Sequence, residues 1–318
     1  LAGRSACLCK ILPNDRIPMT TQRPPTIDAC AAARWQHMLV EPSPWLHEEV
    51  ARRMEERLGW IRLKPQAWAH WGAVRGGIDA HRLLSARYPD AKCFVVEAHR
   101  DIENVAIKKI TKPWWNPTRL MAPDTRFEVP PDASVQMLWS NMGLHAASDP
   151  QAVIADWHRA LAVDGFLMFS CLGPDTLREL RALYSQIGWP PPAHEFTDMH
   201  DWGDMLVSAG FAEPVMDMER ITLGFETPQR LLQELRQLGR NLHPARFAGL
   251  RGRGWLAQLH AQILGKLMEG AHDGQLKLTF EVIYGHALKP AKRLKLGPEV
   301  AMPLEDMRRA LRQGRNGP

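Results

Sequence analysis

The feature that most constrains the fold is an alternation of apolar runs and amphipathic segments between residues 134 and 181. Residues 135–139 form a short apolar run with β-branched and aromatic members, which is typical of a buried strand. Pro150 opens a segment with apolar residues at helical spacing, and Pro suits a first helical turn because its missing N–H needs no partner there. A second apolar run covers residues 166–172, and another helical segment follows Gly173. This order predicts βαβ units in a parallel sheet.

Polar and small residues follow both of these strands. Ser140 and Asn141 come directly after the first, with His145 close behind, and Gly173 and Asp175 follow the second. Ligands of parallel α/β sheets bind beyond the carboxyl ends of the strands. The sequence therefore predicts a pocket at this edge of the sheet.

The rest of the chain supplies elements for a larger sheet. We expect helices at residues 29–37, 45–63, 78–88, 201–209 and 255–268, one starting after residue 101 and one capped by Thr227-Pro228, and strands at residues 67–71, 92–97, 214–225 and 278–288. The helix that begins at Pro150 is expected to end at Asp164-Gly165. Residues 124–134 are interpreted as a loop.

These elements divide the chain into three parts. Residues 1–44 are interpreted as a leader and an irregular N-terminal arm, with Met19 as the working start or, alternatively, with a transit peptide before the fold. Residues 45–290 form one α/β domain with a helical insertion at about 227–270. Residues 291–318 form a basic tail that we expect to be disordered.

Composition excludes several classes of protein. An apolar fraction of 45% and a charged fraction of 24% are ordinary for a globular protein. No run reaches the roughly 18–20 apolar residues of a membrane span, and no apolar segment in the first eighteen residues resembles a secretory signal. The five cysteines have no metal-like spacing, so we expect reduced thiols and a cytoplasmic location.

The net charge of +5 is concentrated at the two ends. Residues 1–25 carry +3 and residues 289–318 carry +5, which leaves −3 for residues 26–288. A nucleic-acid-binding protein is expected to present positive charge on a folded face. The distribution favours solvated tails and argues against a nucleic-acid partner.

Five segments together resemble one enzyme family. They are SNMGLH at 140–145, WHRALAVDGFLMFSCLGPDTLRELR at 157–181, FTDMHDWGDMLVSAGF at 196–211, VMDMERITL at 215–223 and FEVIYGHALKP at 280–290. They are similar to the malonyl-acyl-carrier-protein methyltransferases of biotin synthesis, which are class I S-adenosylmethionine-dependent methyltransferases. The resemblance implies a Rossmann-like, mostly parallel seven-stranded sheet with a terminal antiparallel hairpin. It also implies methylation of the free carboxylate of a malonyl thioester on acyl carrier protein or coenzyme A.

The resemblance further implies a cofactor loop after the first strand, where this chain departs from the family. The loop reads WAHWGAVRGG at 68–77, with Gly72 and Gly76 retained, His70 where the family has an acid and Val74 where it has a glycine. A side chain at a glycine position can block the close approach of the backbone to a ligand. Two interpretations of the loop stay open: a weakened cofactor site and a lost one.

Other site residues follow from the same resemblance. Glu97 is expected to hold the cofactor's ribose hydroxyls and Asp124 to lie near the adenine amine, while Ser140 and Asn141 complete the cofactor-binding set with His70, Gly72 and Gly76. His145 and Arg181 are the candidate catalytic residues, with Arg181 suited to the malonate carboxylate because its planar fork can pair bidentately. The family's N-terminal pocket tyrosine is replaced by Val40.

Two alternatives remain at this point. One is a cofactor-impaired relative that acts as a binding or assembly protein. The other is the complex I assembly factor that hydroxylates an arginine, a related protein that shares the DTLxELR pattern found here at 175–181. Titration with S-adenosylmethionine separates the first from an enzyme, and the mass gained by the substrate separates the second.

Overall fold

The computed structural model describes residues 27–38, 43–111, 123–247, 249–268 and 274–291. The expected leader at residues 1–18, nearly all of the basic tail, and Val40 lie outside the described residues.

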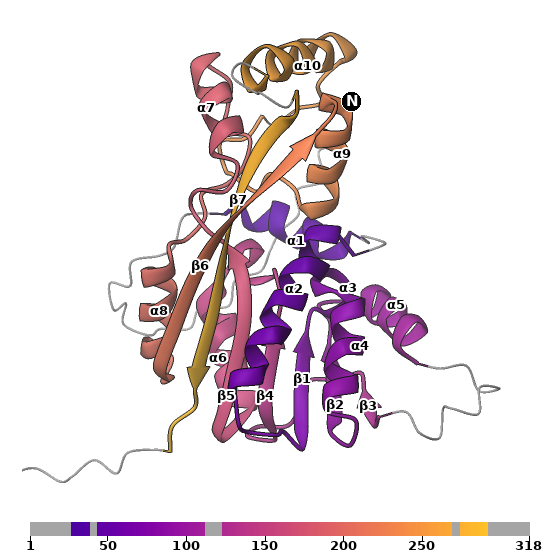
Figure 1. Ribbon diagram of the computed structural model, residues 1–318, viewed down its shortest axis with the longest axis vertical. Coiled ribbons are helices and arrows are strands. Elements are labelled where there is room, and N and C mark those ends of the chain that lie inside the picture. The colour runs from indigo at the N-terminus through magenta and orange to yellow at the C-terminus, as the bar shows by residue number, and fades with distance from the viewer. Residues whose placement is uncertain (1–26, 39–42, 112–122, 248, 269–273, 292–318) are drawn as a thin grey trace, which may run out of the picture.

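A seven-stranded sheet forms the centre of the described chain, in the order β3-β2-β1-β4-β5-β7-β6 (Figure 1). Its strands are β1 Ala67–Trp71, β2 Lys92–Val96, β3 Thr125–Arg126, β4 Val135–Ser140, β5 Leu161–Leu172, β6 Ala212–Phe225 and β7 Leu276–Leu288. The pairs from β3 to β5 are parallel, and β7 runs antiparallel to both β5 and β6. The expected Rossmann-like α/β sheet with an antiparallel terminal hairpin is confirmed.

Helices connect and cover these strands. They are α1 Ala29–His37, α2 Trp45–Arg57, α3 Ala73–Gly76, α4 Ile78–Arg87, α5 Arg100–Ile110, α6 Pro150–Ala160, α7 Arg178–Gln186, α8 Met199–Ser208, α9 Pro228–Leu238 and α10 Arg253–Leu267. Several begin at a side-chain cap: Asp28, Asp149, Asp198 and Thr227 each accept an N–H from the first turn of α1, α6, α8 and α9. Such caps satisfy backbone donors that a helix start leaves unpaired. Two short 3₁₀ turns lie at Leu58–Trp60 and Leu144–Ala146.

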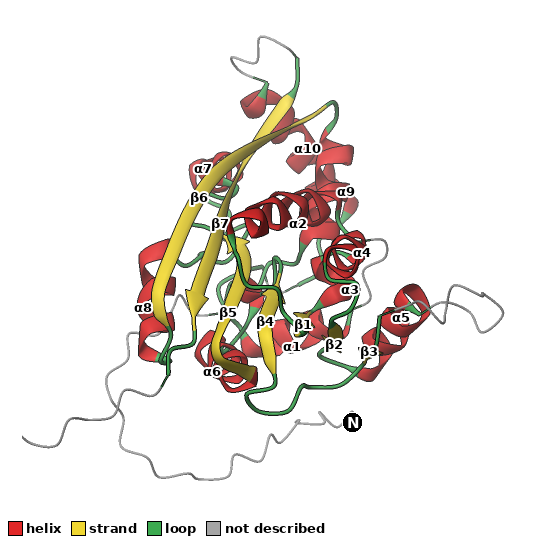
Figure 2. Cartoon of the chain, turned by 60° about the horizontal axis from the view of Figure 1, so that its bottom comes forward, coloured by secondary structure: helices red, strands yellow, loops and turns green. Residues whose placement is uncertain are grey.

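Alternate residues of the central strands supply two cores, one on each face of the sheet. In β1, Trp68 belongs to the core that contains residues of α2 and α4, whereas the next residue, Ala69, belongs to the core that contains residues of α6 and α8. In β4, Trp139 lies in the first core and Leu138 in the second. Figure 2 shows α2 and α4 on one side of the sheet and α6 and α8 on the other.

Three expectations about element boundaries were wrong. The helix expected at 45–63 ends at Arg57, where a 3₁₀ turn at Leu58–Trp60 follows it, and residues 61–66 are not helical. The helix at Pro150 ends at Ala160, because Leu161 is buried and pairs with Val135 as the start of β5. Asp164, at φ +63°, lies inside β5 and not at a helix end, and its N–H donates to the carbonyl of Lys289. The presumed loop at 124–134 contains the short strand β3, which pairs with β2.

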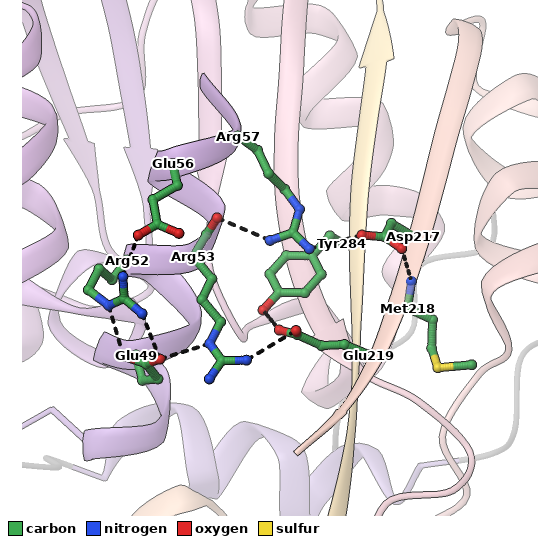
Figure 3. Close-up of polar contacts among 9 residues, drawn as sticks. All are labelled: Glu49, Arg52, Arg53, Glu56, Arg57, Asp217, Met218, Glu219 and Tyr284. Carbon is green, nitrogen blue, oxygen red and sulfur yellow. Dashed lines mark hydrogen bonds and ion pairs between the residues drawn. The ribbon is translucent and has the colours of Figure 1, made fainter. Parts of the chain in front are cut away.

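Helix α2 is joined to the β6–β7 hairpin by a polar network (Figure 3). Arg53 pairs with Glu219 at 3.1 Å, and Arg57 pairs with Asp217 at 2.9 Å. The hydroxyl of Tyr284 donates to Glu219, and the guanidinium of Arg57 lies 3.8 Å from the centre of the Tyr284 ring. The network fixes the hairpin against the helix that precedes β1.

Candidate active site

A cavity of about 330 Å³ lies at the carboxyl ends of β1, β2 and β4. Its lining includes Trp71 and Gly72 after β1, Val96 and Glu97 after β2, Ser140–Ala147 after β4, and Trp35, Gln36, His47, Arg75, Ala98, Ile102, Val129, Val153, Trp157 and Leu238. The position agrees with the rule that ligands of such sheets bind beyond the carboxyl ends of the strands. The volume lies within the usual range for small-molecule sites, about 300–1,000 Å³.

Glu97 places a carboxyl group in the wall of this first cavity. Its Oε1 accepts the backbone N–H of Val74 at 2.8 Å. Burial raises the pKa of Glu97 to about 7, although the N–H of Val74, the nearby Arg75 and the N–H of Ala73 all lower it. The carboxyl group is therefore shared between its protonated and ionised forms near neutral pH.

The turn after β1 follows a sharp path. Gly72 has φ +76°, a conformation that favours glycine, and its N–H donates to the carbonyl of Val96. A Cβ at Gly76 would lie 2.9 Å from the carbonyl oxygen of Asn141, so this glycine permits close packing of the two loops. The side chain of Val74 packs in the hydrophobic core and is not part of the cavity lining. The substitution that raised doubt in the sequence therefore leaves the cavity open.

Asn141 joins three segments around the cavity. Its Nδ2 donates to the carbonyl of His47 at 2.8 Å and to that of Gly76, and its Oδ1 accepts the hydroxyl of Ser170 at 2.6 Å. These three hydrogen bonds link the side chain of Asn141 to α2, to the turn after β1 and to β5. Asn141 therefore holds the three segments together. Ser140, its neighbour, also lines the cavity.

Helix α1 covers one side of the cavity through Trp35, which contacts Arg75 of α3. The guanidinium of Arg75 lies 4.2 Å from the centre of the Trp35 ring and donates to the carbonyls of Trp35 and Met38. Burial lowers the pKa of Arg75 to about 10. Its Nε is buried with no hydrogen-bond partner among the described residues. Trp35 was missed in the sequence, because α1 is distant in the chain from the turn after β1.

His47 is a further cavity residue that the sequence did not indicate. Its Nδ1 donates to the carbonyl of Arg75 at 2.7 Å, and burial lowers its pKa to about 4. The remaining ring nitrogen, Nε2, is buried without a partner within the described part of the chain. The buried polar atoms of His47 and Arg75, with the carboxyl of Glu97, give the apolar cavity a small set of groups that can fix a polar ligand.

A second cavity of about 250 Å³ adjoins the first. The two share Trp35, His145, Ala146 and Leu238. The remaining wall comes from the end of β5 with α7, the segment 192–196, β7, and α9 with the residues that follow it: Leu172, Thr176, Leu177, Leu180, Tyr184, Pro192, Ala193, His194, Phe196, Phe280, Leu232, Leu235, Arg236 and Gly239–Leu242. This second cavity is mainly apolar, and His145 lies at the junction.

The hydrogen bonds of His145 at this junction show which of its ring nitrogens carries the proton. Its Nδ1 accepts the N–H of Leu172 at 3.3 Å, and its carbonyl accepts Nε2–H of His194 at 3.0 Å. Burial lowers the pKa of His145 well below its usual value and that of His194 to about 4, so both rings are neutral near pH 7. Because Nδ1 of His145 is an acceptor, the ring proton is on Nε2, which can donate to a ligand.

Arg181, in α7, lines neither cavity but contacts Phe196, which lines the second. Its guanidinium donates to the carbonyl of Thr176 and lies 5.5 Å from the centre of the Phe196 ring. Its Nε is buried and has no partner among the residues described. Burial lowers its pKa.

The structure thus brings together Gly72, Glu97, Ser140, Asn141 and His145 around the first cavity.

The other residues expected at the site lie elsewhere. His70 lies in the core, with its Nδ1 3.3 Å from Nδ1 of His81. Asp124 is exposed just before β3, at the edge of the sheet where the parallel strands begin, opposite the edge that carries the cavity. Its Oδ2 lies 4.0 Å from Nε of Arg126. Gly76 supports the lining without joining it. Neither cavity is lined by Gly173 or Asp175, because that segment packs on the hairpin, where Asp175 pairs with Arg220 at 2.7 Å.

Within the described residues, no group of three or more histidine, cysteine, aspartate or glutamate side chains could hold a metal ion. Of the helices in this part of the chain, none has the length and apolarity needed to cross a membrane.

Similar proteins were found by sequence and by structure, whereas no protein-family model matches the chain. A malonyl-[acyl-carrier protein] O-methyltransferase of Gallionella capsiferriformans is 39% identical over 262 residues, which are 80% of this chain and 87% of that protein. The enzyme of the same name from Laribacter hongkongensis is 38% identical over 256 residues, covering 78% and 84%.

Solved structures with the same fold share little sequence. A provisionally assigned methyltransferase of Bacillus halodurans matches with a TM-score of 0.52 at 15% identity, over 76% of this chain and 100% of that one. The YcgJ protein of Bacillus subtilis matches with a TM-score of 0.50 at 13% identity, over 76% and 99%. At this level of identity the similarity shows the fold alone.

Proposed function

Because the chain belongs to the malonyl-[acyl-carrier protein] O-methyltransferases, we propose that it methylates the free carboxylate of a malonyl thioester with S-adenosylmethionine as the methyl donor. The observation that carries the proposal is the pair of adjoining cavities with His145 at their junction. The first takes the cofactor and the second the acceptor thioester. The reaction belongs to biotin synthesis, as the sequence resemblance implies, and takes place in the cytoplasm, where reduced cysteines are expected.

The residues of the first cavity fit this cofactor. Ionised Glu97 accepts hydrogen bonds from the two ribose hydroxyls, a role for which a carboxylate at the end of β2 is suited. Arg75 lies close to the turn after β1, and its orphaned Nε and positive charge suit the carboxylate of the cofactor's methionine part. Bound S-adenosylmethionine supplies an electrophilic methyl group on a sulfonium.

The carboxylate that accepts the methyl group has to be positioned and does not have to be activated. A free carboxylate is ionised near pH 7, so the protein needs no strong base to make it nucleophilic. The protein's task is to hold the carboxylate in line and to exclude water. The Nε2–H of His145 donates to one carboxylate oxygen, whereas Arg181, expected from the sequence to pair with the same group, lines neither cavity. The apolar wall of the second cavity keeps water away.

The test uses the purified protein, malonyl-acyl carrier protein and S-adenosylmethionine. Mass spectrometry of the carrier should show a gain of one methylene unit, and the gain should depend on the cofactor. A gain of one oxygen on a protein arginine would support the hydroxylase alternative. Absence of both products, together with no heat in titration with millimolar S-adenosylmethionine, would favour the cofactor-impaired binding protein.

A further inference from the structure

Positive charge is concentrated in one part of the folded chain. Residues 228–268 contain seven arginines and lysines against a single acidic residue, Glu234, whereas all other residues between 26 and 288 sum to −9. The basic segment consists of α9, the connector that follows it, and α10. A local excess of this size in an otherwise acidic domain produces a field that attracts an acidic partner.

The basic residues of this segment are available at the surface. Arg230, Arg236, Arg240 and Arg253 are exposed. Arg236 and Arg253 have no carboxylate partner among the described residues, and Arg230 pairs within α9 with Glu234 at 2.7 Å. Figure 1 shows α9 and α10 together at the end of the molecule where the far part of the β6–β7 hairpin projects.

Exposed apolar side chains lie on the connector between these helices. Leu250 is fully exposed, and Phe247 is 49% exposed. The guanidinium of Arg251 lies 4.4 Å from the centre of the Phe247 ring and 4.0 Å from that of Trp255. Apolar contacts surrounded by arginines are typical of protein interfaces, in which aromatic residues and Arg are enriched.

The same segment borders the second cavity. Helix α9 contributes Leu232, Leu235 and Leu238 to the wall of this cavity. Arg236 in α9 and Arg240 just after it also line the cavity. A partner bound over α9 would therefore stand next to the cavity that takes the acceptor. An apolar cavity beside an arginine-rich surface suits a thioester arm attached to an acidic protein.

We propose that the basic surface, defined as Arg230, Arg236, Arg240 and Arg253 with Phe247 and Leu250, docks the acidic acyl carrier protein. The thioester arm of that carrier enters the second cavity beside α9. This inference rests on the proposed function and adds the location of the partner. A nucleic acid fits less well, because the rest of the domain is acidic and the surface leads into an apolar cavity.

The test compares a carrier substrate with a small one. The double variant Arg230→Glu/Arg253→Glu changes two exposed side chains that line neither cavity. We expect its kcat/KM for malonyl-acyl carrier protein to fall roughly tenfold or more at low salt. Its kcat/KM for malonyl-N-acetylcysteamine should stay within about twofold, since only docking is changed. In the unchanged protein, added salt should lower kcat/KM for the carrier substrate and not for the small one.

The control variant is Arg62→Glu, an exposed arginine in the segment before β1, outside the basic surface. It should leave both substrates unaffected. An equal loss for both substrates in the double variant, or no loss for either, would overturn the docking surface. So would binding of a random DNA duplex as tight as that of the carrier.

Binding of unacylated holo-acyl carrier protein, measured by calorimetry, separates this inference from the proposed function. If the protein binds the carrier and Arg230→Glu/Arg253→Glu weakens that binding while no methyl transfer occurs, docking stands and the activity fails. If methyl transfer occurs and carrier binding is insensitive to the double variant, the activity stands and the docking surface is wrong.

Discussion

At the residue scale, Glu97 combines a buried carboxyl group with a position at the end of β2 inside the first cavity. The N–H of Val74 occupies one of its oxygens, so the other positions remain for ligand hydroxyls. Val74 stands where the family has a glycine, and its side chain points into the core while its N–H serves the carboxylate. The degenerate turn thus retains the backbone donor.

Replacing Glu97 tests this role directly. In Glu97→Gln, loss of charged hydrogen bonds should cost about 1.5–3 kcal/mol of binding free energy, which is roughly 10- to 150-fold in Kd for S-adenosylmethionine. Calorimetric titration measures the change. Asp101→Asn, an exposed acid in the first turn of α5, is the matched control and should leave Kd unaltered. An unchanged Kd in Glu97→Gln would remove Glu97 from the cofactor site.

The raised pKa of Glu97 predicts a pH dependence of cofactor binding. The ionised form accepts the ribose hydroxyls, and the pKa without ligand is about 7. Affinity for S-adenosylmethionine should therefore rise as pH increases through 7 and weaken by up to about tenfold per pH unit below it. Titrations between about pH 5.5 and 8.5 give the curve, and Glu97→Gln should flatten it. A curve that stays the same in the variant would assign the dependence to another group.

His70 of β1 and His81 of α4 form a buried pair, and burial lowers the pKa of both, that of His81 to about 4. The unfolded chain binds these protons below about pH 6.5, whereas the folded protein does not. The free energy of unfolding should therefore fall as pH decreases from about 6.5 toward 4, by up to roughly 1.4 kcal/mol per unit for each residue. Urea denaturation at pH 7 and pH 5 should show a smaller loss for His70→Leu/His81→Leu than for the unchanged protein. His200→Leu, at an exposed site, should not reduce the loss.

At the element scale, α2 is connected to the distant hairpin through Glu219, which accepts from both Arg53 and Tyr284 (Figure 3). Glu219→Ala should lower the free energy of unfolding by about 1–3 kcal/mol, because the buried Tyr284 and the partly exposed Arg53 lose their acceptor. Glu56→Ala is the control, since Glu56 is exposed and pairs with Arg52 on the same helix. Its effect should stay below about 0.5 kcal/mol. Denaturant titration compares them, and equal effects would mean that the network adds nothing between elements.

At the scale of the whole molecule, α1 connects the two cavities, because Trp35 lines both. It is held by the ring contact with Arg75 and by the pair of Asp28 with Arg246 at 2.7 Å. Both contacts join segments far apart in the chain, so the closed site exists only in the folded molecule.

Shortening Trp35 should therefore affect both ligands. We expect Trp35→Ala to raise the Kd of S-adenosylmethionine and the KM of the malonyl thioester, each by roughly tenfold, since an aromatic wall is lost from both sites. Calorimetry and steady-state kinetics measure the two values. Trp60→Ala, at an 88% exposed position, should change neither. A change in only one value would mean that α1 serves a single cavity.

The sequence by itself determined the order of elements, because apolar periodicity and capping residues are local signals. The strands expected at 135–139 and 278–288 and the helix expected at Thr227-Pro228 correspond to β4, β7 and α9. Glu97, Ser140, Asn141 and His145 could be placed at the carboxyl edge, since strand ends are visible in the chain. The tertiary structure alone decided that Arg75, Trp35 and His47 complete the cavity, that Asp124 lies on the opposite edge and that His70 belongs to the core. Contacts between distant segments set these positions, and a linear pattern does not record such contacts.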